Sequence, residues 1–110
     1  LNGENGSDSL FGGAGNDELN EFFGGGALGS NHLDGGAGTD TAVFEYQLGG
    51  LVVDMGVGRA VLGSTGNEVR FAGIENVSGG RGGDRLIGDA QGNVLRGDQG
   101  NDALFGGAGN

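Results

Sequence analysis

Aspartate and asparagine recur at a fixed position along this chain of 110 residues. In 12-GGAGNDELN-20, and again in 97-GDQGNDALF-105, an acidic residue follows a cluster of glycines and precedes a single leucine. Aligned on the glycines, the sequence repeats every nine residues, and the sixth position holds Asp8, Asp17, Asn31, Asp40, Asp84, Asn93 and Asp102. Such oxygens, placed in turns that expose backbone carbonyls, are suited to binding a hard cation.

The strands that must position these oxygens follow from the rest of the repeat. Each unit divides into a six-residue turn, in which glycines allow positive φ and close approach of the backbone, and a three-residue strand. The eighth position points inward by strand alternation, and it holds Leu10, Leu19, Leu33, Ala42, Leu86, Leu95 and Leu104. Two units make one coil, so we expect an all-β fold, a parallel β-roll (β-solenoid) of stacked 18-residue coils.

The repeats fall into two blocks that are separated by a segment of different composition. Residues 1–43 form an amino-terminal block, in which residues 21–25 interrupt the period and are expected to bulge out. Residues 79–110 form a carboxyl-terminal block that stops in mid-pattern. Between them, residues 44–78 carry short apolar and β-branched runs with no helical periodicity, so we expect a non-repeat β insertion that continues the solenoid.

Composition excludes several classes of partner. The 30 glycines occur without any proline, which argues against a collagen-like chain, and the absence of cysteine excludes disulfides and thiol chemistry. The net charge of −10 disfavours nucleic acids and anionic membranes and favours cations. No apolar run is long enough for a membrane span. No signal peptide is visible and the last repeat stops in mid-pattern, so we expect a fragment of a longer protein.

Calcium would resolve a conflict that this sequence creates. One inward leucine per nine residues is a thin core, and stacked coils would place the sixth-position carboxylates directly above one another. Ca²⁺ accepts about 6–8 oxygen ligands from carboxylates and carbonyls, whereas Mg²⁺ demands small octahedral sites. With a single histidine, His32, and no cysteine, softer metals are disfavoured. We therefore expect the chain to bind several Ca²⁺ ions.

The motif G-G-x-G-x-D resembles the nonapeptide of the RTX (repeats-in-toxin) family, whose members carry hemolysin-type calcium-binding repeats. It occurs strictly at residues 12–17, 35–40 and 79–84, while residues 97–102 and 3–8 differ only at the second glycine. The middle segment is also similar to sequences between RTX blocks of large secreted bacterial toxins. The resemblance implies a calcium β-roll in which each ion lies between turns one coil apart.

The resemblance also implies which residues hold the ions. The implied pairs are Asp84 with Asp102, Asp17 with Asp40 and Asp8 with Asn31, while Asn93 would pair with a residue beyond Asn110. The turn glycines expected to contribute carbonyls are Gly6, Gly13, Gly15, Gly36, Gly38, Gly80, Gly82 and Gly100, and the second-position Glu4, Asp89 and Asp98 could add carboxylates. We expect weaker sites at the two asparagines because they lack the charge.

Other interpretations of these turns are weaker. Side chains that merely cap their own turns would not need to agree in register with a leucine two positions later. A phosphate-binding loop requires G-K-[ST] after its glycines, and an EF-hand requires D-x-[DN]-x-[DN]-G-x₅-E; the sequence contains neither. It also contains no Ser/His/Asp or Cys/His set and no convincing acid–base pair, so we expect no catalysis by these residues.

Two functions fit these expectations. The first is a module that folds on calcium binding after a larger extracellular bacterial protein has been secreted, and the resemblance implies export through a type I secretion apparatus. The alternative is a module that binds a polysaccharide or a host surface, because RTX-like modules occur in alginate epimerases and adhesins. A row of cations on one face would favour that alternative, and the available cations are Arg59, Arg70, Arg81, Arg85 and Arg96.

Overall fold

The structure is a computed structural model that describes residues 2–3, 9–21, 30–44, 50–62 and 68–106. Within these residues the chain is all-β and contains no helix, as predicted. The strands are β1 (Asn2–Gly3), β2 (Ser9–Ala14), β3 (Glu18–Glu21), β4 (Ser30–Ala37), β5 (Thr41–Val43), β6 (Leu51–Asp54), β7 (Arg59–Leu62), β8 (Glu68–Ala72), β9 (Asn76–Ser78), β10 (Arg85–Ile87), β11 (Val94–Arg96) and β12 (Ala103–Phe105). In the carboxyl-terminal block, each strand occupies the last three positions of its nonapeptide.

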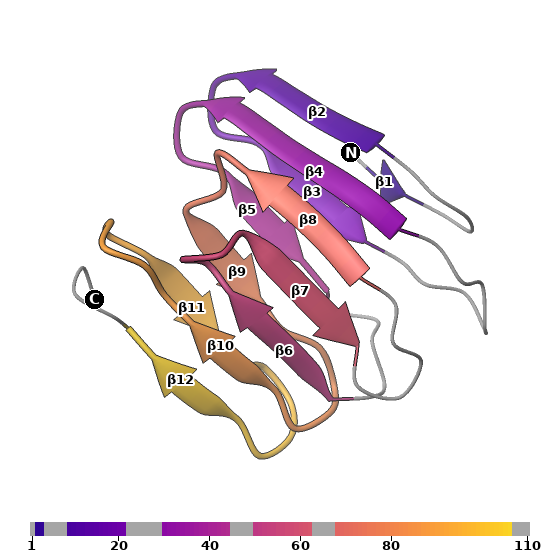
Figure 1. The fold of residues 1–110 in the computed structure, drawn as a ribbon, viewed down its shortest axis with the longest axis vertical. Coiled ribbons are helices and arrows are strands. Elements are labelled where there is room, and N and C mark those ends of the chain that lie inside the picture. Colours follow the sequence, from indigo (N-terminus) through magenta and orange to yellow (C-terminus); the bar gives the residue numbers. More distant parts are fainter. Residues whose placement is uncertain (1, 4–8, 22–29, 45–49, 63–67, 107–110) are drawn as a thin grey trace.

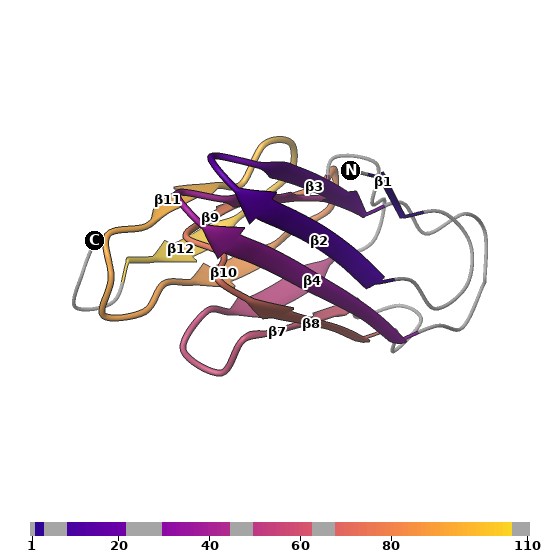
Figure 2. The ribbon, with the colours of Figure 1, turned by 90° about the horizontal axis from the view of Figure 1, so that it is seen from above.

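The strands form two sheets that lie one above the other (Figures 1 and 2). The order is β1-β3-β5-β9-β11 in the five-stranded sheet and β12-β10-β6-β7-β8-β4-β2 in the seven-stranded sheet. Successive strands of each repeat block alternate between the two sheets, and their pairings are parallel. This arrangement is consistent with the predicted β-roll.

The register of the paired strands follows the nine-residue period. In the carboxyl-terminal block, β10 pairs with β12 so that Leu86 lies opposite Leu104, an offset of 18 residues. In the amino-terminal block, β3 pairs with β5, and the bonded residues Asp17 and Asp40 are 23 positions apart. The larger offset matches the interruption predicted at residues 21–25, of which residues 22–25 lie outside the described part of the chain.

The middle segment departs from the purely parallel coiling that the repeats predict, because β7 runs antiparallel to both of its neighbours. The turn between β6 and β7 explains the reversal. Asp54 Oδ1 accepts hydrogen bonds from the N–H groups of Gly56 (3.0 Å) and Val57 (3.3 Å). Gly58, at a φ of 76°, donates its N–H to the Asp54 carbonyl at 2.9 Å. An aspartate that caps its own turn and a glycine with positive φ together reverse the chain.

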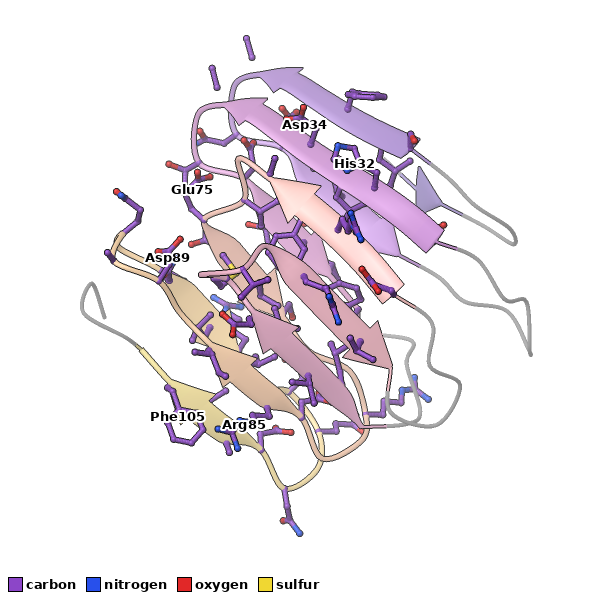
Figure 3. The ribbon with its side chains drawn as sticks, in the orientation of Figure 1. His32, Asp34, Glu75, Arg85, Asp89 and Phe105 are labelled. Carbon is purple, nitrogen blue, oxygen red and sulfur yellow. The ribbon has the colours of Figure 1, made fainter. Side chains whose placement is uncertain are left out.

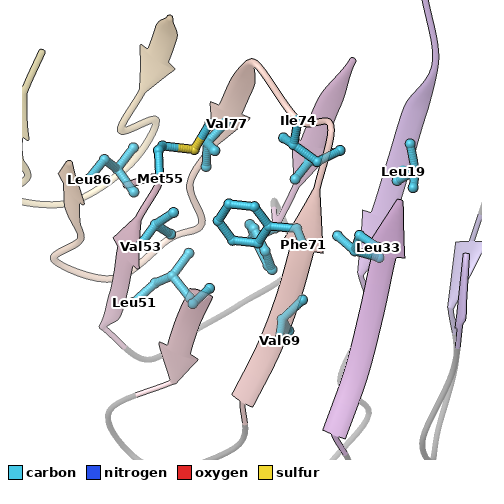
Figure 4. Packing of buried hydrophobic residues seen from close by; sticks show 13 residues of the cluster. Leu19, Leu33, Leu51, Val53, Met55, Val69, Phe71, Ile74, Val77 and Leu86 are labelled. Carbon is cyan, nitrogen blue, oxygen red and sulfur yellow. The ribbon is translucent and has the colours of Figure 1, made fainter. Parts of the chain in front are cut away.

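The core lies between the two sheets (Figure 4). Its members from the repeats are the eighth-position residues Leu19, Leu33, Ala42 and Leu86, which are fully buried, with Leu10 and Leu95 partly buried. Leu104, on the edge strand β12, is 48% exposed. The remaining members come from the middle of the chain: Phe44, Leu51, Val53, Met55, Ala60, Val69, Phe71, Ile74 and Val77. The middle segment thus supplies most of the apolar packing that the repeats lack.

Candidate calcium-binding turns

Two turns of the amino-terminal block share one backbone conformation. In the turn at residues 12–17, Gly13 and Gly15 have φ angles of 103° and 124°. The turn at residues 35–40 repeats this pattern at its own second and fourth positions. A side chain with a Cβ atom is strained in this left-handed region, which explains why glycine occupies both positions. The carbonyls of the two turns consequently have equivalent orientations.

The turns of the carboxyl-terminal block are less uniform. Asp98 stands at a second position where glycine is usual, has a φ of 62°, and accepts a hydrogen bond from Ser78 Oγ at 2.6 Å. Gly100, two positions later, has a φ of 108°. Gly80 and Gly82, although they match the motif, do not have positive φ angles in the described structure. The turn at these two glycines therefore orients its carbonyls differently.

First-position glycines make room for the sixth-position side chain of their own turn. A Cβ atom on Gly12 would lie 2.8 Å from Asp17 Oδ2 and 2.6 Å from the carbonyl oxygen of Gly35 in the neighbouring turn. A Cβ atom on Gly79 would lie 2.5 Å from Asp84 Oδ2 and 3.0 Å from the corresponding carbonyl oxygen. In both turns a carboxylate oxygen and a carbonyl oxygen flank the same point. The arrangement recurs at Gly35 beside Asp40 and at Gly88 beside Asn93.

Hydrogen bonds link the sixth-position residues of neighbouring turns. The N–H of Asp17 donates to Oδ1 of Asp40 at 2.7 Å. The N–H of Asp84 likewise donates to Oδ1 of Asp102 at 2.8 Å. These are two of the pairs that the sequence places one coil apart, and the structure brings the members of each pair together.

The second carboxylate oxygens of Asp17 and Asp40 are buried and have no hydrogen-bond partner in the described structure. Asp40 itself is 0% exposed. A buried polar group without a partner is destabilising. Two carboxylates on neighbouring turns also repel each other. A cation between these turns would offset both terms.

Asp84 is held in an environment that disfavours its own charge. Burial raises the pKa of the Asp84 carboxyl above its ordinary value of 3.8, and the nearby charges of Asp102 and Asp98 raise it further. Hydrogen bonds from the N–H groups of Gly80 (2.8 Å) and Leu51 (3.0 Å) act in the opposite direction without outweighing burial. A nearby cation would favour the ionised carboxylate.

The donor set at these turns fits calcium. Among the described residues, no three Asp, Glu or His side chains gather in a group that could hold a metal ion. A cation would therefore need backbone carbonyls in addition to carboxylates, and the Gly35 carbonyl beside Asp17 is such a donor. Ca²⁺ accepts mixed shells of carboxylate, carbonyl and water oxygens, whereas zinc favours nitrogen and sulfur ligands.

The first turn of the chain contains further predicted ligands. Gly6 and Asp8 lie outside the described residues, as does the second-position Glu4. Asn31, the predicted partner of Asp8, is on β4 and is only 2% exposed. The pairing of Asp8 with Asn31 therefore stays a prediction.

Asn93 and Asp89 hydrogen-bond mainly within their own turn. Asn93 Oδ1 accepts the Asp89 N–H at 2.9 Å, and Asp89 Oδ1 accepts the Gln91 N–H at 2.7 Å. Asn93 Nδ2 also donates to the carbonyl of Glu75 at 2.8 Å. Figure 3 shows Asp89 and Glu75 along one edge of the molecule. The neutral amide of Asn93 thus makes the hydrogen bonds of its turn without the negative charge that Asp17 or Asp84 carries.

Glu75 is a candidate that the repeat alignment missed. The N–H of Asp40 donates to Glu75 Oε2 at 2.8 Å, just as the N–H of Asp17 donates to the Asp40 carboxylate. Glu75 therefore occupies the place of a sixth-position residue although no G-G-x-G-x-D motif precedes it. A signal was present, since counting nine residues back from Gly79 places Glu75 sixth and the buried Val77 eighth.

The arginines do not form a single row. Arg59 and Arg70 both pair with Glu68 on the seven-stranded sheet, at 3.6 Å and 3.0 Å. The Arg85 guanidinium lies over the Phe105 ring, 4.9 Å from its centroid, at the edge of the same sheet (Figure 3). The arginine of β11 lies on the other sheet. Three arginines are thus engaged with neighbours on one sheet.

Comparison with known families agrees with this geometry. The family described as RTX calcium-binding nonapeptide repeat (4 copies) matches residues 1–20, 23–42 and 78–110, which together exceed half of the chain. The chain belongs to the RTX family. A search of curated proteins finds no significant match to this RTX chain.

Membership of the RTX family fixes the cofactor and the general role. RTX nonapeptide repeats bind Ca²⁺, and the several copies in this RTX chain indicate several ions. The family is a structural calcium-binding module that occurs in secreted bacterial proteins. No helix long and apolar enough to cross a membrane is found in the described portion of the structure.

Proposed function

We propose that this RTX chain is a calcium-triggered folding module of a larger protein that bacteria export through a type I secretion apparatus. The observation that carries the proposal is the pair of buried carboxylate oxygens, Asp17 Oδ2 and Asp40 Oδ2, that have no hydrogen-bond partner among the described residues. Each destabilises the folded chain unless a cation pairs with it. Calcium binding and folding are then one event.

In this proposal the chain is a β-roll of stacked coils, with ions between turns one coil apart. Asp17 and Asp40 hold one ion, and Asp84 and Asp102 hold another; the hydrogen bonds within each pair support this assignment. Carbonyls of the turn glycines complete the shells. Residues 44–78 join the two repeat blocks into one solenoid, and the pairing of β8 with β4 and of β6 with β10 supports that role.

The stability of the folded chain follows from the difference in calcium concentration between the two sides of the cell envelope. At the ~mM calcium outside a cell, sites with Kd of about 10⁻⁴–10⁻³ M fill. Each filled site adds RT ln(1 + [L]/Kd) to stability, which is about 1.4 kcal/mol at ten times Kd. In the calcium-poor cytosol the acidic, glycine-rich chain stays unfolded and extended, which suits passage through a secretion channel.

Circular dichroism tests this function. The far-ultraviolet spectrum should show little regular structure in a chelator and a β-sheet spectrum in a few mM CaCl₂. An equal concentration of MgCl₂ is the control for ionic strength and should restore little of the signal. If the spectra in chelator and in calcium are the same, the proposal is wrong.

A second candidate, binding of an acidic oligosaccharide, is favoured by a groove of about 410 Å³ along the five-stranded sheet. Thr41, Asn76, Ser78 and Arg96 are among its lining residues. Hydroxyl and amide groups can hydrogen-bond to sugar hydroxyls, and a guanidinium can pair with a sugar carboxylate. Titration with acidic oligosaccharides at fixed calcium should show binding that Arg96→Gln weakens. Absence of binding to the unmodified chain would leave only the calcium-dependent scaffold.

A further inference from the structure

We propose that Glu75 completes an additional cation site, where the turn at residues 35–40 meets the corner at residues 73–75 of the middle segment. The inference rests on the proposed calcium function of the repeat turns. It extends that function to a carboxylate outside the nonapeptides and outside the residues that match the RTX family.

The corner at residues 73–75 is much shorter than the turn beside it. β8, which pairs with β4, ends at Ala72, and β9, which pairs with β5, begins at Asn76. Three corner residues therefore lie alongside the six residues of the turn at 35–40. Ile74, in the middle of the corner, is buried in the core at 6% exposure. The corner thus replaces a glycine turn with one apolar residue and keeps the residues at either end.

The two ends of the corner reproduce contacts made between paired repeat turns. The N–H of Asp40 donates to Glu75 Oε2 at 2.8 Å, and the N–H of Glu75 donates to the Asp40 carbonyl at 3.1 Å. A Cβ atom on Gly35 would meet Asp40 Oδ2 at 2.6 Å and would also meet the carbonyl oxygen of Gly73. The turn at residues 12–17 shows the same grouping of a carboxylate oxygen and a neighbouring carbonyl.

The state of Asp40 independently points to a ligand. Its side chain is 0% exposed, and its Oδ2 has no hydrogen-bond partner within the described structure. This atom and the Gly73 carbonyl oxygen both flank Gly35, and the Glu75 carboxylate accepts the Asp40 N–H. Two carboxylates and a carbonyl make a hard, oxygen-only donor set of the kind that Ca²⁺ completes with further carbonyls or water.

The length of the glutamate side chain suits its position. Because the corner lacks most of a repeat turn, the residue at its end needs a longer reach than aspartate to meet the Asp40 N–H. The cation at this site would connect the last turn of the amino-terminal block to the middle segment. Calcium would then stabilise the junction between the blocks as well as the repeats within them.

Counting bound ions in Glu75→Gln tests the proposal. The amide of glutamine keeps an oxygen that can accept the Asp40 N–H but removes the negative charge. Glu68→Gln is the matched control, since it removes the same charge from the same segment, on a residue that pairs with Arg59 and Arg70. Native mass spectrometry of the calcium-loaded chains should show one ion fewer in Glu75→Gln and an unchanged number in Glu68→Gln.

The outcomes separate this inference from the proposed function. An equal number of ions in Glu75→Gln and in the unmodified chain overturns the inference alone. No bound calcium in the unmodified chain overturns the proposed function as well. A measurement that needs no variant is trace Mn²⁺ added to the calcium-loaded chain, which should broaden the Glu75 carboxyl ¹³C resonance and leave that of Glu68 sharp. A sharp Glu75 resonance would also refute the site.

Discussion

The backbone N–H of Asp17 donates to Oδ1 of Asp40 at 2.7 Å, while Oδ2 of each residue has no hydrogen-bond partner in the part of the chain that the structure describes. The fold therefore uses one carboxylate oxygen to join neighbouring turns and leaves the other for a ligand. Because the backbone holds the carboxylates close together, their mutual repulsion opposes folding until a cation arrives.

Asp40→Asn should weaken both the site shared with Asp17 and the site proposed beside Glu75, while it preserves the shape of the side chain. The variant keeps an oxygen to accept the Asp17 N–H but lacks the second anionic oxygen. At calcium ten times Kd, each site that is lost should cost about 1.4 kcal/mol of unfolding free energy. In a calcium titration monitored by circular dichroism, the variant should therefore reach its folding midpoint at a higher calcium concentration than the unmodified chain. Asp54→Asn is the control, since asparagine keeps the Oδ1 acceptor that caps the turn between β6 and β7, and it should match the unmodified chain.

Gly79→Ala should weaken the carboxyl-terminal block because the new Cβ atom would lie 2.5 Å from Asp84 Oδ2. Crowding of this kind costs about 1–3 kcal/mol. Gly92→Ala is the matched control, since a Cβ atom there would meet nothing within 4 Å. Urea unfolding in saturating calcium compares the two variants. Equal midpoints would show that the space beside Asp84 has no role.

Phe44→Ala should destabilise the chain even when calcium is saturating. Phe44 is 0% exposed and belongs to the core between the sheets. Truncation of a buried phenylalanine costs about 3–5 kcal/mol, whereas Val57→Ala, at a residue 70% exposed, should change stability by less than about 0.5 kcal/mol. Thermal unfolding in excess calcium measures both. A Phe44→Ala chain as stable as the unmodified one would mean that packing contributes little.

The stabilisation by calcium should shrink as the pH falls. The raised pKa of Asp84 means that the calcium-free fold binds this proton more tightly than the unfolded chain does. The stabilisation of the calcium-free fold by this proton is fully present below the ordinary pKa of 3.8. It is lost as the pH rises through the raised pKa of Asp84 in the folded chain. Calcium must displace this proton, and the proton competes more strongly at lower pH. The calcium concentration at the midpoint of a titration should therefore rise as the pH falls from 7 to 5.

Asp84→Asn provides the check on this pH dependence. The variant cannot bind the proton, so its calcium midpoint should vary less steeply with pH than that of the unmodified chain. Asp54→Asn should keep the original dependence. The same slope in all three chains would assign the effect to other carboxylates.

The repeat pattern predicts much of this architecture because its period is fixed. Glycine and leucine spacing places Leu19 and Leu33 in the core and pairs Asp17 with Asp40, and the register agrees. The antiparallel β7 could not be predicted from the period, since its reversal depends on the local capping of a turn by Asp54. In the middle segment, short strands separated by glycine turns therefore include an antiparallel strand in place of parallel coiling.

Glu75 escaped prediction for a related physical reason. The residues that precede it form a short corner around the buried Ile74 instead of a glycine turn, so no motif marks the position. Counting back from Gly79 gives its place in the period, and the pairing of β5 with β9 shows that Glu75 lies opposite Asp40. Tertiary register, rather than local sequence, brings these two carboxyl groups together.

The most direct test of the central claim is the anomalous scattering of crystals grown in CaCl₂. We expect a calcium peak between the turns that contain Asp17 and Asp40, and another between those that contain Asp84 and Asp102. A map without calcium at either place, with these carboxylates facing bulk water, would contradict the claim that cations hold the turns together.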